Sequence, residues 1–130
     1  RDGFAVEQDY DKAKAFYEKG AQMGDFNCYN KLGDMAYHGW GGPVEYAQAL
    51  TYFQSGADAP SAEQRYSLQR SMTAIGRAYE LGRGVEKNLA TAAEKYLEGY
   101  KYGSIECRDA YLRCSEALEG STPSAGGKPE

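Results

Sequence analysis

The sequence contains few of the residue types from which catalytic and metal sites are usually built. Its 130 residues include one histidine, three cysteines, one tryptophan and four prolines. A zinc site needs several nitrogen or sulfur ligands at short spacings, and no such group is present. His38 stands alone beside Gly39 and Trp40, and the sequence indicates no nucleophile to pair with it. We therefore expect no catalytic residue, no metal and no cofactor.

Charge and hydropathy exclude two more classes of protein. The 15 Lys and Arg and the 19 Asp and Glu give a net charge of −4, and the basic residues form no run. This pattern argues against a groove for nucleic acid. The sequence has no stretch of about 18 apolar residues, so we expect no segment that spans a membrane. Leu, Ile and Val are few, whereas Ala and Tyr are frequent, as in helices that approach closely over small side chains.

One segment of the sequence occurs three times. Its copies begin at Gly3, Gly39 and Gly82 and align without gaps up to Ala13, Ala49 and Ala92. An aromatic residue and a glycine follow each copy at the same offsets, as Tyr17 and Gly20, Phe53 and Gly56, and Tyr96 and Gly99. The copies are about 36 and 43 residues apart, which is typical of stacked helical repeats. We therefore expect one all-α domain whose function lies on a surface rather than in a catalytic pocket.

Each unit predicts a pair of helices. In the second unit the first helix extends over residues 27–37 and ends at a Gly-rich stretch, because Gly adopts the left-handed conformation of helix C-caps. The second helices begin near a capping residue, good at Asp9 and Asn88 and poorer at Glu45. Residues three and four apart then form one buried face. In the second and third units this face holds Ala49, Phe53, Gly56 and Ala57, and Ala92, Tyr96, Gly99 and Tyr100.

Small residues recur inside the first helices. Glycine costs about 1 kcal/mol relative to Ala in a helix interior, so we expect Gly33 and Gly76 to lie against a neighbouring helix where a Cβ would clash. Another position is held in turn by Cys28, Ser71 and Cys107. This position predicts a small buried side chain, and hence structural free thiols. Cys107 and Cys114 lie about 10 Å apart along one predicted helix, beyond the reach of a disulfide.

Two stretches carry the motif of a known repeat family. They are Leu32-Gly33-x-x-Ala36 with Gly39-x-Gly41, and Ile75-Gly76-x-x-Tyr79 with Gly82-x-Gly84-Val85. With Lys12-Ala13, Phe16-Tyr17 and Tyr52-Phe53, they resemble the Sel1-like repeat, a relative of the tetratricopeptide repeat. The resemblance covers about residues 3–117 and implies a right-handed α-α superhelix, a solenoid of helical hairpins. Ala36 replaces the family's Tyr and Gly42-Pro43 its Val, so we expect a looser middle loop.

The motif and its spacing divide the chain into units. We expect a partial unit over residues 1–25, units over 26–60 and 61–103, a capping helix over 104–119 and a disordered tail over 120–130. Seven extra residues precede the third unit's motif, where Ser61-x-x-Gln64 after Pro60 indicates a capping box. We expect a helix over about 62–81 that protrudes, either as a partner contact or through neutral drift. Because residue 3 is predicted to belong to an inter-helix loop, whether further repeats precede residue 1 stays open. The compartment therefore stays open, with bacterial periplasm or cytoplasm slightly favoured.

Recognition is expected on the exposed side of the first helices, which line the concave groove in tetratricopeptide-like stacks. The candidate partner-binding residues are Asn30, Asp34, Tyr37, Arg70, Thr73, Arg77, Asp109 and Arg113, and Asn27, Glu80, Glu106 and Glu116 share their face. The residues at these positions differ between units. A recognition surface would show this variation, and so would a surface that is merely solvated. Arg70 and Arg77 can pair with a partner's carboxylate, and Tyr37 and Trp40 are candidate aromatic anchors.

The resemblance implies a non-catalytic scaffold or adaptor that binds a protein partner through the concave face. An inhibitor or immunity-type protein that sequesters its partner is one concrete form of this function. The alternative is a small-ligand-binding or hydrolytic protein of the cell-wall or β-lactam-linked Sel1-like type, and a third hypothesis is a structural spacer without a groove. Because the sequence shows no nucleophile with a polarising partner, we favour the scaffold. The partner's identity and the oligomeric state stay open.

Overall fold

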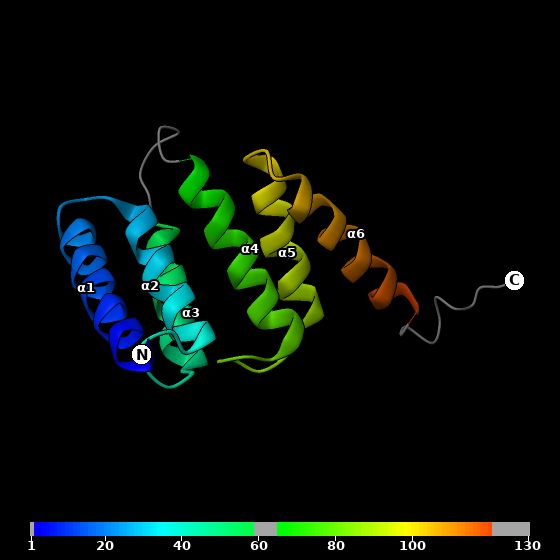
Figure 1. The fold of residues 1–130 in the computed structure, drawn as a ribbon. Helices are drawn as coiled ribbons and strands as arrows, with labels where there is room; N and C mark the ends of the chain where they lie inside the picture. The colour runs from blue at the N-terminus through cyan, green and yellow to red at the C-terminus, as the bar shows by residue number, and fades with distance from the viewer. Residues whose placement is uncertain (1, 59–64, 121–130) are drawn as a thin grey trace, which may run out of the picture.

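Helices arranged in two layers make up the described part of the protein. The computed structural model describes residues 2–58 and 65–120, with side chains from residue 9 onward. The helices within these ranges are α1 (Asp2–Gln22), α2 (Phe26–His38), α3 (Tyr46–Gly56), α4 (Arg65–Leu81), α5 (Leu89–Lys101) and α6 (Ile105–Gly120). Each helix packs on its neighbours in sequence, and α4 also contacts both α2 and α6. In Figure 1, α3 and α5 lie behind the layer formed by α2, α4 and α6. The prediction of an all-α solenoid of helical hairpins is confirmed, whereas the right-handed turn of its superhelix stays a prediction.

The first helix begins earlier than the sequence predicted. We expected an inter-helix loop at Gly3 and a helix start near Asp9, but α1 begins at Asp2. The first copy of the repeat has Ala5 where the later copies have Gly41 and Gly84. Those two glycines have φ values of 82° and 84°, a left-handed conformation that Ala disfavours and that a helix does not contain. The loop conformation is therefore lost in the first copy, and the helix continues through it.

The two Gly-x-Gly loops have the same conformation. Their first glycines have φ values of 73° at Gly39 and 72° at Gly82. Equivalent backbone hydrogen bonds of 2.9 Å close both loops, from Glu45 N–H to the Ala36 carbonyl and from Asn88 N–H to the Tyr79 carbonyl. The expectation of a looser middle loop is wrong, because Gly42-Pro43 is accommodated without the loss of these bonds. As predicted, the Asn88 side chain caps α5 by accepting from Thr91 N–H, whereas Glu45 makes no side-chain cap for α3.

The repeated glycines are sites of close contact between helices. A Cβ at Gly33 would lie 2.5 Å from the Phe53 ring, and one at Gly76 would lie 2.6 Å from the Tyr96 ring. The predicted close approach within each hairpin is therefore confirmed, with the aromatic side chain of the second helix as the contacting group. Between units, the glycines of the second helices lie against the small residues of the next first helix, in the pairs Gly20 with Cys28, Gly56 with Ser71 and Gly99 with Cys107.

Two clusters of buried residues pack between the helices, one among α2, α3 and α4 and the other between α5 and α6. The first contains Tyr37, Ala49, Leu50, Phe53, Met72, Ala74, Ile75 and Ala78, and the second contains Ala92, Ala93, Tyr96, Cys107, Ala110 and Cys114. One residue of the predicted buried face, Tyr100, is 43% exposed. The equivalent positions hold Ala21 and Ala57, and a space that fits a methyl group does not admit a phenol ring. The predicted capping box at residues 61–64 lies outside the described residues, as does the predicted tail over 120–130 except for Gly120, which is the last residue of α6.

Candidate partner-binding face

Two hollows lie side by side on the face formed by the first helices. The central hollow has a volume of about 320 Å³ and is lined by Asn30, Asp34, Phe53, Tyr66, Gln69, Arg70, Thr73, Ala74, Arg77, Ser104 and Glu106. The outer hollow, of about 390 Å³, is lined by Tyr10, Ala13, Tyr17, Lys31, Asp34, Met35, Trp40 and Arg70. Asp34 and Arg70 belong to both linings. The hollows therefore form one depression that crosses the first helices, with these two side chains between its halves.

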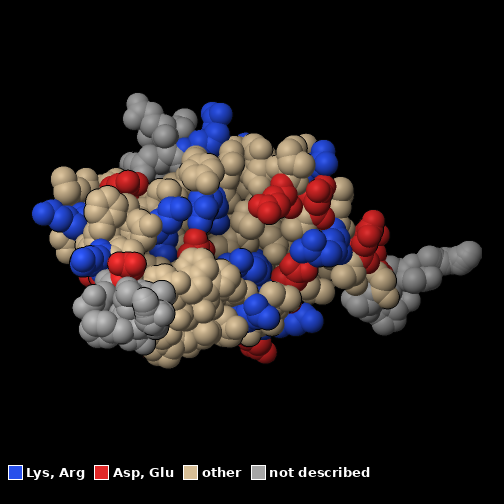
Figure 2. All heavy atoms as spheres, in the orientation of Figure 1, with Lys and Arg blue, Asp and Glu red and all other residues tan. Residues whose placement is uncertain are grey.

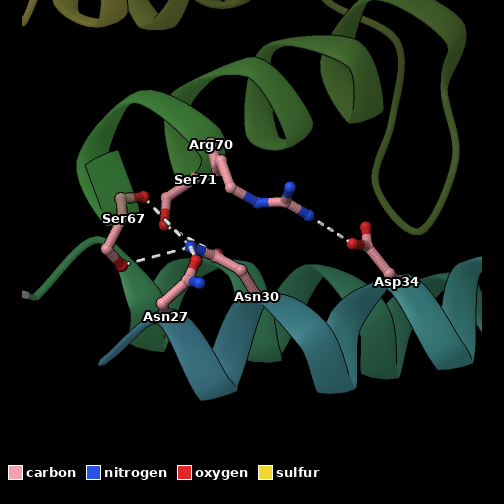
Figure 3. Close-up of polar contacts among 6 residues, drawn as sticks. All are labelled: Asn27, Asn30, Asp34, Ser67, Arg70 and Ser71. Carbon is pink, nitrogen blue, oxygen red and sulfur yellow. Dashed lines mark hydrogen bonds and ion pairs between the residues drawn. The ribbon is translucent and has the colours of Figure 1, made fainter. Parts of the chain in front are cut away.

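Asp34 and Arg70 form an ion pair between adjacent units. The Arg70 Nη2 atom lies 2.5 Å from Asp34 Oδ2, and both side chains are partly buried. Figure 3 shows the guanidinium group of α4 reaching across to α2. The structure thus brings these two predicted site residues together. It also gives Arg70 a carboxylate from its own chain, which was not anticipated from the helix sequences taken separately.

Asn30 is a structural residue and not part of an exposed face. Its side chain is 0% exposed and bridges α2 to α4, as Figure 3 shows. Its Nδ2 donates to the Ser67 carbonyl at 3.0 Å and to Ser67 Oγ at 3.1 Å, while its Oδ1 accepts from Ser71 Oγ at 2.8 Å. The prediction that Asn30 is exposed to a partner is therefore wrong. A polar side chain between helices is retained in the core because each of its bonds has a partner there.

Tyr37 is also buried, with an exposed fraction of 9%. The guanidinium carbon of Arg77 lies 3.9 Å from the centroid of its ring, and that of Arg83 lies 5.6 Å away. Arg83 also donates a hydrogen bond to the Tyr37 hydroxyl, and this bond raises the pKa of the guanidinium group. The prediction of Tyr37 as an exposed anchor is therefore wrong, because its ring is buried and lies against the guanidinium groups of two arginines.

Thr73 and Gln69 connect α4 to the last hairpin. The Thr73 hydroxyl donates to the Gln69 carbonyl at 2.8 Å and lies 3.1 Å from Cys107 Sγ. Gln69 Nε2 donates to the carbonyl of Tyr102, in the turn before α6, at 2.6 Å. Thr73 lines the central hollow, but its hydroxyl is already bonded within the chain.

Glu80 is the centre of a second contact between units. Its carboxylate accepts two hydrogen bonds from Arg113, at 2.8 and 2.9 Å, and one from the Tyr96 hydroxyl at 2.8 Å. The Arg113 bonds lower the pKa of the Glu80 carboxyl. Burial and the bond to Glu80 raise the pKa of Tyr96. Asp109, the remaining predicted residue, is exposed and contacts only the neighbouring Arg108 among the described residues.

The depressed pKa of Glu80 predicts a specific loss of stability in acid. The contribution of Glu80 is complete above the ordinary value of 4.5 and is lost as the pH falls through the lower folded value. We expect Glu80→Gln to lower the free energy of unfolding by about 1 kcal/mol at pH 7, and by progressively less below pH 4.5. Urea titrations between pH 3 and 7 measure this. Glu116→Gln, an exposed change of the same charge, is the control, and equal pH profiles of the two variants would contradict the assignment.

Neither the cysteines nor the histidine is among the residues that line the central hollow. All three cysteines are free and buried, which confirms the prediction of structural thiols, and burial raises the pKa values of Cys28 and Cys114. The exposed His38 ring is stacked on Trp40 at a centroid distance of 4.6 Å. Trp40 is 45% exposed and lines the outer hollow. Its role as an aromatic anchor stays a prediction.

Three important residues were not among the predicted ones. Tyr66 is 60% exposed at the central hollow, but it lies next to the inserted segment, where the repeat gives no equivalent position. Ser67 bonds to both Asn30 and the Gly56 carbonyl. Arg83 occupies the middle of the second Gly-x-Gly stretch, where the first stretch has Trp40. A large side chain at the variable position of an otherwise fixed loop was the available signal for Arg83.

Charges are unevenly distributed over this face. Figure 2 shows basic side chains over α2 and α4 and side chains of both signs over α6. Within residues 2–58 and 65–120, no group of three potential ligands for a metal ion occurs. In the same ranges, no helix combines the length and the apolar character needed to cross a membrane.

Comparison with known proteins identifies the repeat. The family model for the Sel1 repeat matches residues 1–25, 27–61 and 69–98. The searches of curated proteins and of solved structures gave no match. Sel1 repeats generally mediate protein–protein interactions, and the family is typically a non-catalytic scaffold. Because the matched segments include most of the chain and the described helices form the expected hairpins, this chain belongs to the Sel1 repeat family.

Proposed function

We propose that this protein is a non-catalytic scaffold that binds a protein partner across the face of α2, α4 and α6. One observation carries the proposal. The residues that repeat between units lie in contacts between helices, whereas the residues that line the central hollow, apart from Phe53, are mostly ones that differ from unit to unit. A surface whose residues vary on a fixed framework is what recognition by a repeat protein requires.

The shape and chemistry of the depression favour a polypeptide over a small ligand. The central and outer hollows adjoin at the Asp34–Arg70 pair, so together they extend along several helices. Exposed aromatic residues, Tyr66 and Trp40, lie one in each hollow, and aromatic residues are enriched at protein interfaces. The hydrolytic alternative has less support, because the His38 ring contacts aromatic rings rather than a hydroxyl or thiol group among the described residues.

Comparative capture tests this proposal. The variant Tyr66→Ala removes an exposed aromatic side chain of the central hollow. The matched variant Tyr100→Ala makes the same change on α5, which contributes nothing to either lining. Immobilised wild type and both variants are incubated with lysate of the source organism, and the bound proteins are quantified by mass spectrometry.

We expect at least one protein to be retained by the wild type and the α5 variant and depleted about tenfold on the hollow variant, which corresponds to about 1.4 kcal/mol. Loss on the α5 variant alone, or no difference between the three, would refute the proposed face. The stoichiometry of the purified complex then separates the two forms of the proposal. An adaptor holds two partners at once, whereas an inhibitor or immunity-type protein covers a single one.

A further inference from the structure

Arg77 is a partly buried cation without a counter-charge in the described part of the chain. Its guanidinium group lies against the Tyr37 ring at 3.9 Å and near the Phe53 ring at 6.0 Å. Its Nε atom is buried and has no hydrogen-bond partner. The side chain lines the central hollow, so this charge is partly removed from water but remains reachable from the hollow. Such a group gains most from a charged acceptor supplied from outside.

The acidic groups around Arg77 are already engaged or lie elsewhere. Asp34 is paired with Arg70, and Glu80 is paired with Arg113. Glu106 lines the same hollow but forms no ion pair with Arg77. Glu106 is the neighbour in sequence of Cys107, whose thiol contacts Thr73. Thr73 lies one helical turn, about 6 Å, before Arg77 on α4. The Arg77 end of the hollow is therefore left with its positive charge unmatched.

A second arginine strengthens the positive charge at this point. Arg83 lies over the same Tyr37 ring and bonds to its hydroxyl, and it forms no ion pair with a described carboxylate. The two arginines come from α4 and from the loop after it, so one buried aromatic side chain holds both. A stacked guanidinium group is already oriented, so less side-chain entropy is lost when it binds a carboxylate.

We propose that the central hollow receives an acidic side chain, Asp or Glu, from a segment of the protein partner, and that this carboxylate binds Arg77. This inference rests on the proposed function and adds the chemistry of the partner. The geometry differs from the sequence prediction, in which Arg70 and Arg77 together awaited a carboxylate. Arg70 is paired with Asp34, and Arg77 is the one of these two arginines that remains available to bind a partner's carboxylate.

Selection from random peptides tests the acidic chemistry directly. Phage that display random twelve-residue peptides are selected on the full chain, and the recovered peptides are synthesised with amidated C-termini. The affinity of each peptide for the wild type, for Arg77→Met and for Arg108→Met is then measured by fluorescence and compared. Met retains an unbranched side chain over the Tyr37 ring, and thermal unfolding checks that each variant is folded. Arg108 is an exposed arginine of α6 outside the hollow, so its variant has the same net charge as Arg77→Met.

We expect the selected peptides to be enriched in Asp and Glu relative to the unselected library. Their affinity should fall about tenfold on Arg77→Met and remain within about twofold on Arg108→Met. Replacing the acidic residue of the peptide by its amide should have no further effect on Arg77→Met. This last result shows that the two groups act on each other.

Several outcomes would overturn the inference. Selection of neutral peptides, equal binding to wild type and Arg77→Met, or no selected peptide at all would each count against an acidic segment at Arg77. Each peptide is also made with a free C-terminus, and binding by that form but not by the amidated one would assign the carboxylate to the chain end and also contradict the inference. None of these results affects the comparative capture experiment. The proposed function itself falls only when the Tyr66→Ala variant captures the same proteins as the wild type.

Discussion

Replacing Gly84 by Ala is expected to lower the free energy of unfolding by about 3 kcal/mol. Gly84 has a φ value of 84°, and Ala in this left-handed conformation costs about 1–2 kcal/mol. In addition, a Cβ would lie 2.5 Å from the Tyr46 carbonyl oxygen and 2.9 Å from Ala47 N. These are backbone atoms at the start of α3, so the clash cannot be relieved by a change of rotamer, and overpacking adds about 1–3 kcal/mol.

Two other glycines allow the cost of the left-handed backbone to be measured separately from the cost of the steric clash. Gly24 has a φ value of 97°, but a Cβ added there would meet no atom within 4 Å, and Gly42 has neither a positive φ nor such a neighbour. We expect Gly24→Ala to cost about 1 kcal/mol and Gly42→Ala to cost close to nothing. Chemical denaturation of the three variants measures the series. If Gly84→Ala were no more destabilising than Gly24→Ala, the loop would not be packed against α3 as described.

Replacing Asn30 by Leu is expected to destabilise the fold by a similar amount, about 3 kcal/mol. Leu has a branched side chain of similar shape to that of Asn but cannot form hydrogen bonds. The Ser67 carbonyl, Ser67 Oγ and Ser71 Oγ would each lose the bond that Asn30 provides, and each buried polar group left unsatisfied costs about 1–3 kcal/mol. For a chain of this size the unfolding temperature should fall by about 10 °C.

Asn27→Leu is the matched control for this change. Asn27 lies one turn earlier on α2 and is only partly buried, and its side chain is 3.5 Å from Asn30 Nδ2. We expect its replacement to change the free energy of unfolding by less than about 0.5 kcal/mol. Thermal unfolding followed by circular dichroism compares the two variants. Equal effects would show that the Asn30 bridge between α2 and α4 does not stabilise the fold.

The fold was predictable because its determinants are local and repeated. Gly33 and Gly76 are unfavourable in a helix, so their recurrence at one position indicated a close contact before the aromatic partner was known. Phe53 and Tyr96 provide that contact in the structure. The start of α1 could not be predicted by the same reasoning, because Ala5 in the first copy removes the glycine on which the loop conformation depends.

The candidate site was less predictable because it depends on contacts between units. Asp34 and Arg70 were both predicted as site residues, but an ion pair between residues 36 positions apart depends on how two hairpins stack. Sequence periodicity gives the direction of a side chain around its own helix and not the residue that it meets on the next one. Asn30 and Tyr37 were assigned to the surface for the same reason, although α4 and the loop after it cover both.

Hydrogen exchange on the complex is the most direct test of recognition by the first helices. Amide exchange of the full chain is measured by mass spectrometry alone and with the partner recovered by comparative capture. We predict that the partner slows exchange in peptides from α2, α4 and the start of α6, and leaves peptides from α3 and α5 unchanged. Protection confined to α3 and α5 would contradict the account, because those helices contribute only Phe53 to the hollows.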